Sequence, residues 1–315
     1  MSSKLYSGRR ILRLLAHLLH PLIGSGLGYI KPLDFIFRHF ISMLVPKQFI
    51  IAHINDCKLG MDIGGSYGLD ALARGLLLGN SYEAHTTMLF GELVKPDMVV
   101  VDIGAHIGYY TILASKLVGP KGRVFAFEPE PKNYADLKKN IELNRCTNIA
   151  ALRTAVSSRN GKARLFTTTG SSGECSLIDT RQQPRQRPKD AITTDTTTLD
   201  NILGSMVVDA IKIDVDGGEM DVLMGAGKVI KGSPDIKIFT EFWEPGLKSA
   251  GYSCAEYWDK LMGYGLEYIY LIDERKKRVW RTDLDGLLEY LRRVPGVNLL
   301  CSKRMVVGDT VEVIQ

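Results

Sequence analysis

The stretch Val99-Val-Val-Asp-Ile-Gly-Ala-His-Ile-Gly-Tyr-Tyr-Thr111 decides the fold. An apolar strand at 99–103 runs into a turn framed by two glycines, and a helix begins near Tyr109. Gly104 and Gly108 can adopt turn conformations that a Cβ disfavours, and they let a ligand approach the backbone closely. The stretch therefore predicts a strand, a ligand-binding turn and a helix, which together form the first half of a βαβ unit.

A second apolar strand, Arg123-Val-Phe-Ala-Phe-Glu-Pro129, ends at Glu128, twenty residues after Gly108. A carboxylate at the tip of the second strand suits the two hydroxyls of a ribose. The turn and the second strand therefore predict a βαβ unit that binds a nucleoside.

Strands and helices continue to alternate along the chain, which predicts an α/β fold with a doubly wound, mostly parallel, seven-stranded sheet. Residues 167–198 are rich in Thr, Ser and Gly and are predicted to form a loop over one face of the sheet. The strands are expected at 99–103, 123–128, 149–156, 208–214, 236–241, 267–272 and 297–303, with a short strand pair at 49–61 and an edge hairpin at 162–168. The helices are expected at 81–94, 109–117, 131–144, 198–204, 219–230 and 253–263.

The net charge of +5 is placed unevenly. Residues 1–80 contain nine Lys or Arg and four Asp or Glu, so the rest of the chain is neutral overall. We therefore divide the 315 residues into a basic N-terminal helical and β appendage at 1–74 and one large α/β domain at 75–315.

Two apolar segments lie in the appendage. Residues 9–23 read as a basic amphipathic helix, and residues 33–45 form a second apolar segment. Neither supplies the roughly 18 uninterrupted apolar residues that cross a bilayer. The segments are either a cap packed on the domain or a peripheral contact of residues 9–45 with a membrane surface. We favour the cap, because amphipathic helices usually pack on their own protein.

The five cysteines are odd in number and show no metal-ligand spacing. This argues against a disulfide framework and against a structural zinc site. A cytoplasmic location is the simplest prediction, with peripheral attachment to the inner face of the membrane as the alternative.

The turn after the first strand discriminates between two nucleoside ligands. NAD requires G-x-G-x-x-G, whereas His106 stands here where a glycine would let pyrophosphate press on the backbone. S-adenosylmethionine contains a ribose, an adenine and an amino-acid tail, and needs no such approach. We therefore predict S-adenosyl-L-methionine as the cofactor.

Several further motifs follow the turn in a fixed order. They are, with the turn itself, Tyr82-Glu83, VVVDIGAHIGYYT at 99–111, GRVFAFEPEPKNYADLKKNIELN at 122–144, TLDNIL at 198–203, IKIDVDGGEMDVLMGA at 211–226 and a strand ending in Glu241. With these motifs the sequence resembles the FkbM family of S-adenosylmethionine-dependent methyltransferases over about residues 75–305. The sequence departs from the family pattern at His106, where asparagine is more frequent, at Asp216, where glutamate is usual, and in the basic loop at 181–189.

The resemblance implies a class I methyltransferase fold and a set of cofactor contacts. Glu128 is predicted to accept the ribose hydroxyls, and Asp102 either orders the turn or meets the methionine amino group. Pro129 and Asn133 are expected at the adenine edge, with Ala155 and Val156 as an apolar wall. The full predicted cofactor set is Tyr82, Glu83, Asp102, Gly104, Ala105, His106, Gly108, Tyr109, Thr111, Glu128, Pro129, Asn133, Ala155, Val156 and Asp214.

Asp214 and Glu241 are the candidate catalytic bases, because each lies at the carboxyl end of a predicted strand. Asp214 would be nearest the transferable methyl group. Strand alternation places Lys212 on the same side as Asp214, so an ion pair between them is an equally open reading. Glu219 is either a favourable charge at a helix start or a catalytic group.

Two further possibilities are a histidine as the proton acceptor and a metal ion at the site. All six histidines lie at or before His106, so His85 and His106 are the only histidine alternatives near the predicted site. Asp214, Asp216, Glu219 and Glu241 could together hold Mg²⁺, but acids near strand ends commonly cluster without a metal. We predict no metal.

The predicted activity is methyl transfer from S-adenosylmethionine to a hydroxyl of a sugar, glycolipid or other small molecule by in-line displacement. The preference for oxygen comes from the family resemblance. One alternative is a nucleic-acid methyltransferase that uses the basic residues, although these are scattered and no RNA-binding module is present. The other is a cofactor-binding protein without catalysis. The sequence does not predict the oligomeric state.

Overall fold

The computed structural model describes residues 48–54, 56–63, 72, 82–168, 171–179, 188–306 and 310–312. The apolar segments predicted at 9–23 and 33–45, and residues 181–187 of the basic loop, lie outside these ranges. The choice between a cap and a membrane-surface segment therefore stays a prediction. Within the described residues, no helix has the length and apolar character needed to cross a membrane.

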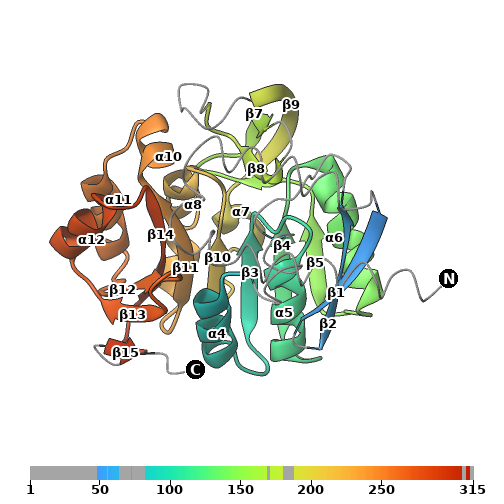
Figure 1. The fold of residues 1–315 in the computed structure, drawn as a ribbon, viewed down its shortest axis with the longest axis horizontal. Helices are drawn as coiled ribbons and strands as arrows, with labels where there is room; N and C mark the ends of the chain where they lie inside the picture. The colour runs from blue at the N-terminus through green and yellow to red at the C-terminus, as the bar shows by residue number, and fades with distance from the viewer. Residues whose placement is uncertain are drawn as a thin grey trace, which may run out of the picture.

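A large twisted sheet forms the centre of the described chain, in the order β15-β13-β12-β14-β11-β10-β3-β4-β5 (Figure 1). The five strands from β11 to β5 are parallel, and β14 runs antiparallel between β11 and β12. The strands are β3 (Val99–Ile103), β4 (Arg123–Phe127), β5 (Ile149–Leu152), β10 (Ala210–Ile213), β11 (Lys237–Trp243), β12 (Tyr268–Asp273), β13 (Arg278–Arg281), β14 (Gly296–Ser302) and β15 (Thr310–Glu312).

The α/β doubly wound fold is confirmed, because helices cover both faces of this sheet (Figure 1). The seven strands predicted from the sequence are present, and β13 and β15 extend one edge. One face packs on α4 (Ala84–Leu93), α5 (Tyr109–Val118) and α6 (Pro131–Leu143). The helices on the other face include α7 (Leu199–Leu203), α8 (Glu219–Met224), α9 (Gly227–Gly232), α10 (Glu244–Ser249), α11 (Cys254–Met262) and α12 (Leu284–Leu291).

Residues 167–198 are not a loop, which corrects the prediction. Half of this stretch forms β8 (Ser171–Ser176) and β9 (Pro188–Thr197), which pair with β7 (Gly161–Thr168) in a second sheet of order β6-β9-β7-β8. The strand predicted at 149–156 accordingly divides into β5 in the large sheet and β6 (Ala155–Val156) in the small one. Threonine, which suggested a loop by composition, also favours strands because its side chain is β-branched.

The helix predicted at 219–230 is broken into α8 and α9. Asp200 explains the break, because its N–H donates to the carbonyl oxygen of Gly225 at 3.0 Å. Its carboxylate also accepts the N–H groups of Lys228 and Val229, both at 2.9 Å, in the first turn of α9. A contact from α7 therefore ends one helix and caps the next. The sequence also did not predict α10, α12, β13 or β15.

The strand pair expected at 49–61 is confirmed as β1 (Gln48–Ile54) and β2 (Cys57–Ile63), and its β2 strand docks on α6. Asn140 accepts the N–H of Gly60 at 2.7 Å and donates to the carbonyl oxygens of Gly60 at 3.0 Å and Ile107 at 2.8 Å. One helical turn later, Asn144 pairs in the same way with both backbone groups of Lys58, at 2.8 and 2.6 Å. The two amides thus bind β2 much as a neighbouring strand would. The boundary at residue 74 stays a prediction, but this hairpin packs on the α/β domain.

Replacing Asn140 with alanine is expected to lower the free energy of unfolding by about 2 kcal/mol, because buried backbone groups of Gly60 and Ile107 lose their partners. Asn201 is an exposed asparagine on α7, so Asn201→Ala provides a control whose effect should stay within about 0.5 kcal/mol. Urea unfolding of both variants measures the difference. Equal, small losses would show that the amide does not anchor the hairpin.

Candidate functional site

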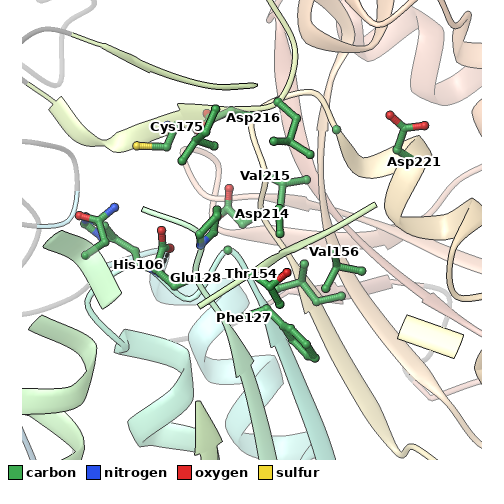
Figure 2. Close-up of a pocket in the computed structure, with 18 residues that line it drawn as sticks. His106, Phe127, Glu128, Thr154, Val156, Cys175, Asp214, Val215, Asp216 and Asp221 are labelled. Carbon is green, nitrogen blue, oxygen red and sulfur yellow. Dashed lines mark hydrogen bonds between the residues drawn. The ribbon is translucent and has the colours of Figure 1, made fainter. Parts of the chain in front are cut away.

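A cleft lies at the carboxyl ends of β3, β4, β5 and β10. The small sheet lies beside these strand ends (Figure 1). Its volume, including the solvent-open mouth, is about 620 Å³. Ligands of open α/β sheets bind at this edge of the strands. In Figure 2, His106 and Glu128 lie at one side, Asp214 lies near the centre, and Asp221 lies at the far side.

Eight of the predicted cofactor residues line this cleft: Gly104, His106, Glu128, Pro129, Asn133, Ala155, Val156 and Asp214. The other predicted residues do not line it: Tyr82, Glu83, Asp102, Ala105, Gly108, Tyr109, Thr111 and the candidate base Glu241. Sequence reasoning did not assign ten further lining residues to the cofactor: Ile103, Phe127, Thr154, Leu165, Cys175, Leu177, Val215, Asp216, Gly218 and Asp221.

The glycine turn is required by the packing of the chain itself. Gly104 and Gly108 have φ angles of +84° and +97°. A Cβ on Gly104 would lie 1.8 Å from the carbonyl oxygen of Asp214, and one on Gly108 would lie 2.6 Å from a methyl carbon of Leu137. From the sequence, both glycines were expected to let a ligand approach the backbone. The structure adds that β10 and α6 already occupy the space that a side chain would need.

Glu128 is buried at the side of the cleft, and each of its carboxylate oxygens accepts one backbone N–H. His106 donates to Oε2 and Glu130 donates to Oε1, both at 2.8 Å. Burial raises the pKa of Glu128 to about 7, although these two N–H groups act to lower it. The Asn133 side chain is a third hydrogen-bond partner of this carboxyl group. A carboxylate has about four lone-pair sites, so capacity remains for a ribose hydroxyl.

Asp102 contacts the start of α5, and the choice between its two predicted roles stays a prediction. Its side chain is 3% exposed and accepts a hydrogen bond from the Thr111 hydroxyl at 2.5 Å. Burial raises the pKa of Asp102 to about 6, against the opposing effect of Thr111. The contact joins the end of β3 to the first turn of α5.

Tyr82 and Tyr109 tie the start of α4 to the start of α5. The Tyr109 hydroxyl donates to the carbonyl oxygen of Tyr82 at 3.3 Å, and the two rings pack edge to face with centroids 5.5 Å apart. The Thr87 hydroxyl donates to the same carbonyl oxygen at 2.8 Å. These contacts place both tyrosines in the support of the site, away from the cleft lining.

Lys212 is 1% exposed and pairs with Asp214, as strand alternation suggested. Its Nζ lies 3.1 Å from Asp214 Oδ2 and 3.7 Å from Glu83 Oε2. Burial alone would lower the pKa of Lys212, but Asp214 and Glu83 raise it above its ordinary value. The Tyr110 hydroxyl donates to Glu83 at 2.8 Å.

Glu241 and Glu219 are carboxyl groups that the fold removes from water near Asp214. Burial, together with the negative charges of Asp214 and Asp216, raises the pKa of Glu241 well above its usual value. Glu219 accepts the N–H groups of Val215 and Gly217, both at 3.2 Å, and burial raises its pKa to about 7. Glu219 therefore orders the loop after β10.

Asp216 joins the loop after β10 to the small sheet. It has a φ of +52°, and its Oδ2 accepts the N–H of Cys175 at 3.1 Å. Its carbonyl oxygen accepts the Ser176 hydroxyl at 2.8 Å. The sequence singled out Asp216 because the family usually has glutamate at this position. The partners of Asp216 on β8 could not be identified from the sequence, because that stretch was predicted to be a loop.

The two histidine alternatives are separated by the fold. His106 lines the cleft, whereas His85 lies in the first turn of α4 with its Nδ1 3.2 Å from Glu274 Oε2. Among the described residues, no group of three or more His, Cys, Asp and Glu side chains is arranged to hold a metal ion.

Comparison with protein families gives a match to the methyltransferase FkbM domain over residues 102–269, which is more than half of the chain. The protein belongs to the FkbM methyltransferase family. It is an S-adenosylmethionine-dependent methyltransferase, as the family resemblance implied.

Two curated relatives and one solved structure are similar to parts of this chain. The 2-O-methyltransferase NoeI of Sinorhizobium fredii is 28% identical over 204 residues, covering 60% of this chain and 82% of the relative. The hexuronic acid methyltransferase AglP of Haloferax volcanii is 30% identical over 146 residues, covering 45% of this chain but only 56% of the relative. A crystal structure titled methyltransferase FkbM from Methylobacillus flagellatus is 18% identical with a TM-score of 0.40, covering 73% of this chain and 52% of that one.

If Glu128 accepts the ribose hydroxyls as a carboxylate, binding of S-adenosylmethionine should weaken as the pH falls through its pKa of about 7. Protonation removes an acceptor, so the dissociation constant should rise about fivefold from pH 7 to pH 6. Titration calorimetry at several pH values measures it. In Glu128→Gln, binding should be weaker and the same pH dependence should disappear. If the dependence persists, another group such as His106 is responsible.

Proposed function

We propose that this methyltransferase transfers a methyl group to a hydroxyl of a saccharide, with Asp214 as the base. The observation that carries the assignment of the base is the position of Asp214. It lines the cleft next to the glycine turn, whereas Glu241 does not line it. The names of the relatives support the acceptor class, since one is a 2-O-methyltransferase and another is a hexuronic acid methyltransferase.

The residues at the Glu128 side are proposed to hold the nucleoside. Glu128 would accept the ribose hydroxyls, with its orientation set by the N–H groups of His106 and Glu130. Phe127 and Val156 supply apolar surface for a planar base, and both line the cleft (Figure 2). Pro129 and Asn133 border the same side.

S-adenosylmethionine supplies an activated methyl group, so the protein's task is to align the acceptor oxygen and remove its proton. As the new C–O bond forms in line with the breaking C–S bond, the hydroxyl proton passes to a carboxylate oxygen of Asp214. The Asp214 side chain is 30% exposed at the cleft and its other contact is Lys212, so it can meet an acceptor. The small sheet contributes Leu165, Cys175 and Leu177 to the lining, and these side chains exclude water from one side.

The decisive experiment supplies the full chain with methyl-labelled S-adenosylmethionine and a panel of acceptors. The panel contains neutral methyl glycosides, the matching uronates, and an RNA transcript. We expect label on a saccharide oxygen, located by mass spectrometry. Labelled RNA, or label on nitrogen, would overturn the proposed acceptor class.

Asp214→Asn should lower kcat by about 100-fold or more, because the amide cannot accept the proton. Its dissociation constant for S-adenosylmethionine should stay within about threefold of the original. Glu241→Gln is the matched control on the neighbouring strand β11 and should lower kcat far less. Turnover kinetics with calorimetry separate these effects, and an active Asp214→Asn enzyme would exclude Asp214 as the base.

A further inference from the structure

Three carboxyl groups surround one buried ammonium group at the end of β10. Asp214 lies 3.1 Å and Glu83 lies 3.7 Å from Lys212 Nζ, and the charge of Glu241 also acts on Lys212. These groups come from β10, from the residue before α4, and from β11. A single lysine cannot neutralise three carboxylates, so the arrangement determines which of them is ionised.

The three carboxyl groups differ in how far they are removed from water. Burial raises the pKa of Glu83, and burial raises the pKa of Glu241 well above its usual value. Asp214 is the closest to the ammonium group, and it alone of the three lines the cleft. Removing a charge from water is costly unless an opposite charge lies beside it, and Asp214 has that partner at hydrogen-bond distance.

Lys212 is also in contact with an aromatic ring. Its Nζ lies 5.2 Å from the centre of the Tyr110 ring, and the Tyr110 hydroxyl donates to Glu83. Glu83 occupies the N-cap position of α4 but makes no side-chain cap hydrogen bond. Glu274 accepts the N–H groups of His85 and Thr86 instead, at 2.9 and 2.8 Å. A glutamate from a distant hairpin therefore caps the helix, and Glu83 is directed to Lys212.

Other titratable groups near Asp214 are acids or phenols. Burial raises the pKa of Asp102 to about 6 and that of Glu219 to about 7, so both lose their charge before the solution becomes strongly acidic. Lys212 then remains the cation at the cluster. The charged and titratable groups that face Lys212 or Asp214 are Glu83 before α4, Asp102 on β3, Tyr110 on α5, Glu219 on α8 and Glu241 on β11.

We propose that Lys212 is a positioning residue that keeps Asp214, rather than Glu83 or Glu241, as the ionised carboxylate and directs it into the cleft. The inference rests on the proposed role of Asp214 as the base. Lys212 touches neither cofactor nor acceptor, because it is 1% exposed and does not line the cleft. Its effect on the reaction passes through the charge and the orientation of Asp214.

The test follows the titration of the Asp214 carboxyl by carbon-13 NMR in the full chain labelled at aspartate. The Asp214→Asn variant assigns the signal. In Lys212→Met the midpoint should rise by about one pH unit or more, because the cation at hydrogen-bond distance from Asp214 is lost. In Lys212→Arg, which keeps the charge, the midpoint should stay within about 0.3 units of the original.

Glu83→Gln is the matched control within the same cluster. It removes the contact with Lys212 but keeps the cation, so the midpoint should not rise as it does in Lys212→Met. A midpoint unchanged in Lys212→Met would overturn the proposal. So would equal shifts in Lys212→Met and Glu83→Gln, because these would indicate disturbed packing rather than a lost charge.

A second readout covers the case in which Lys212→Met does not fold. The acidic limb of the pH dependence of kcat/KM in Lys212→Arg should coincide with that of the original protein. A limb displaced to higher pH by a unit or more would overturn the proposal. The two proposals fail separately. An active Asp214→Asn enzyme would exclude Asp214 as the base, whereas the NMR midpoints would still show whether Lys212 controls the ionisation of Asp214.

Discussion

The turn after β3 and the end of β10 approach one another so closely that a Cβ on Gly104 would lie 1.8 Å from the carbonyl oxygen of Asp214. This contact sets the distance between the glycine turn and the loop that carries the proposed base. The same turn is bound from the other side, where the N–H groups of Gly104 and Ala105 donate to the carbonyl oxygen of Phe127, both at 3.0 Å. The ends of β3, β4 and β10 are thereby held together, and the cleft lies above them.

The support for this edge extends far from the cleft. Asn140 on α6 connects the β1–β2 hairpin to the carbonyl oxygen of Ile107 in the turn, and Thr111 connects α5 to Asp102. On the other side, Glu274 caps α4 while Glu83 meets Lys212. Buried polar groups are costly when unpaired, so these contacts stabilise a single arrangement of the elements around the site.

The sequence predicted the site best where one short segment supplies both the element and its function. The strand, the glycine turn, α5 and Glu128 lie within 30 residues and appear where they were expected. Prediction was weaker where the partner is distant in the sequence. In the sequence, Glu241 and Asp214 are equivalent as acids at predicted strand ends, and only the fold shows that Asp214 lines the cleft whereas Glu241 does not. The small sheet was missed because composition cannot show that β8 and β9 find partners in β7.

The sequence by itself determined the α/β class, the nucleoside-binding unit and the FkbM family, because these depend on local periodicity, glycine spacing and ordered motifs. The tertiary structure decided which acids face the cleft and which cation they share. It also decided that Asp216 joins the small sheet to the loop after β10. These features depend on burial and charge between segments separated by up to about 130 residues, as in the contact between Lys212 and Glu83. A linear pattern fixes the side of a strand on which a residue lies, but only packing determines its distance from water and from other charges.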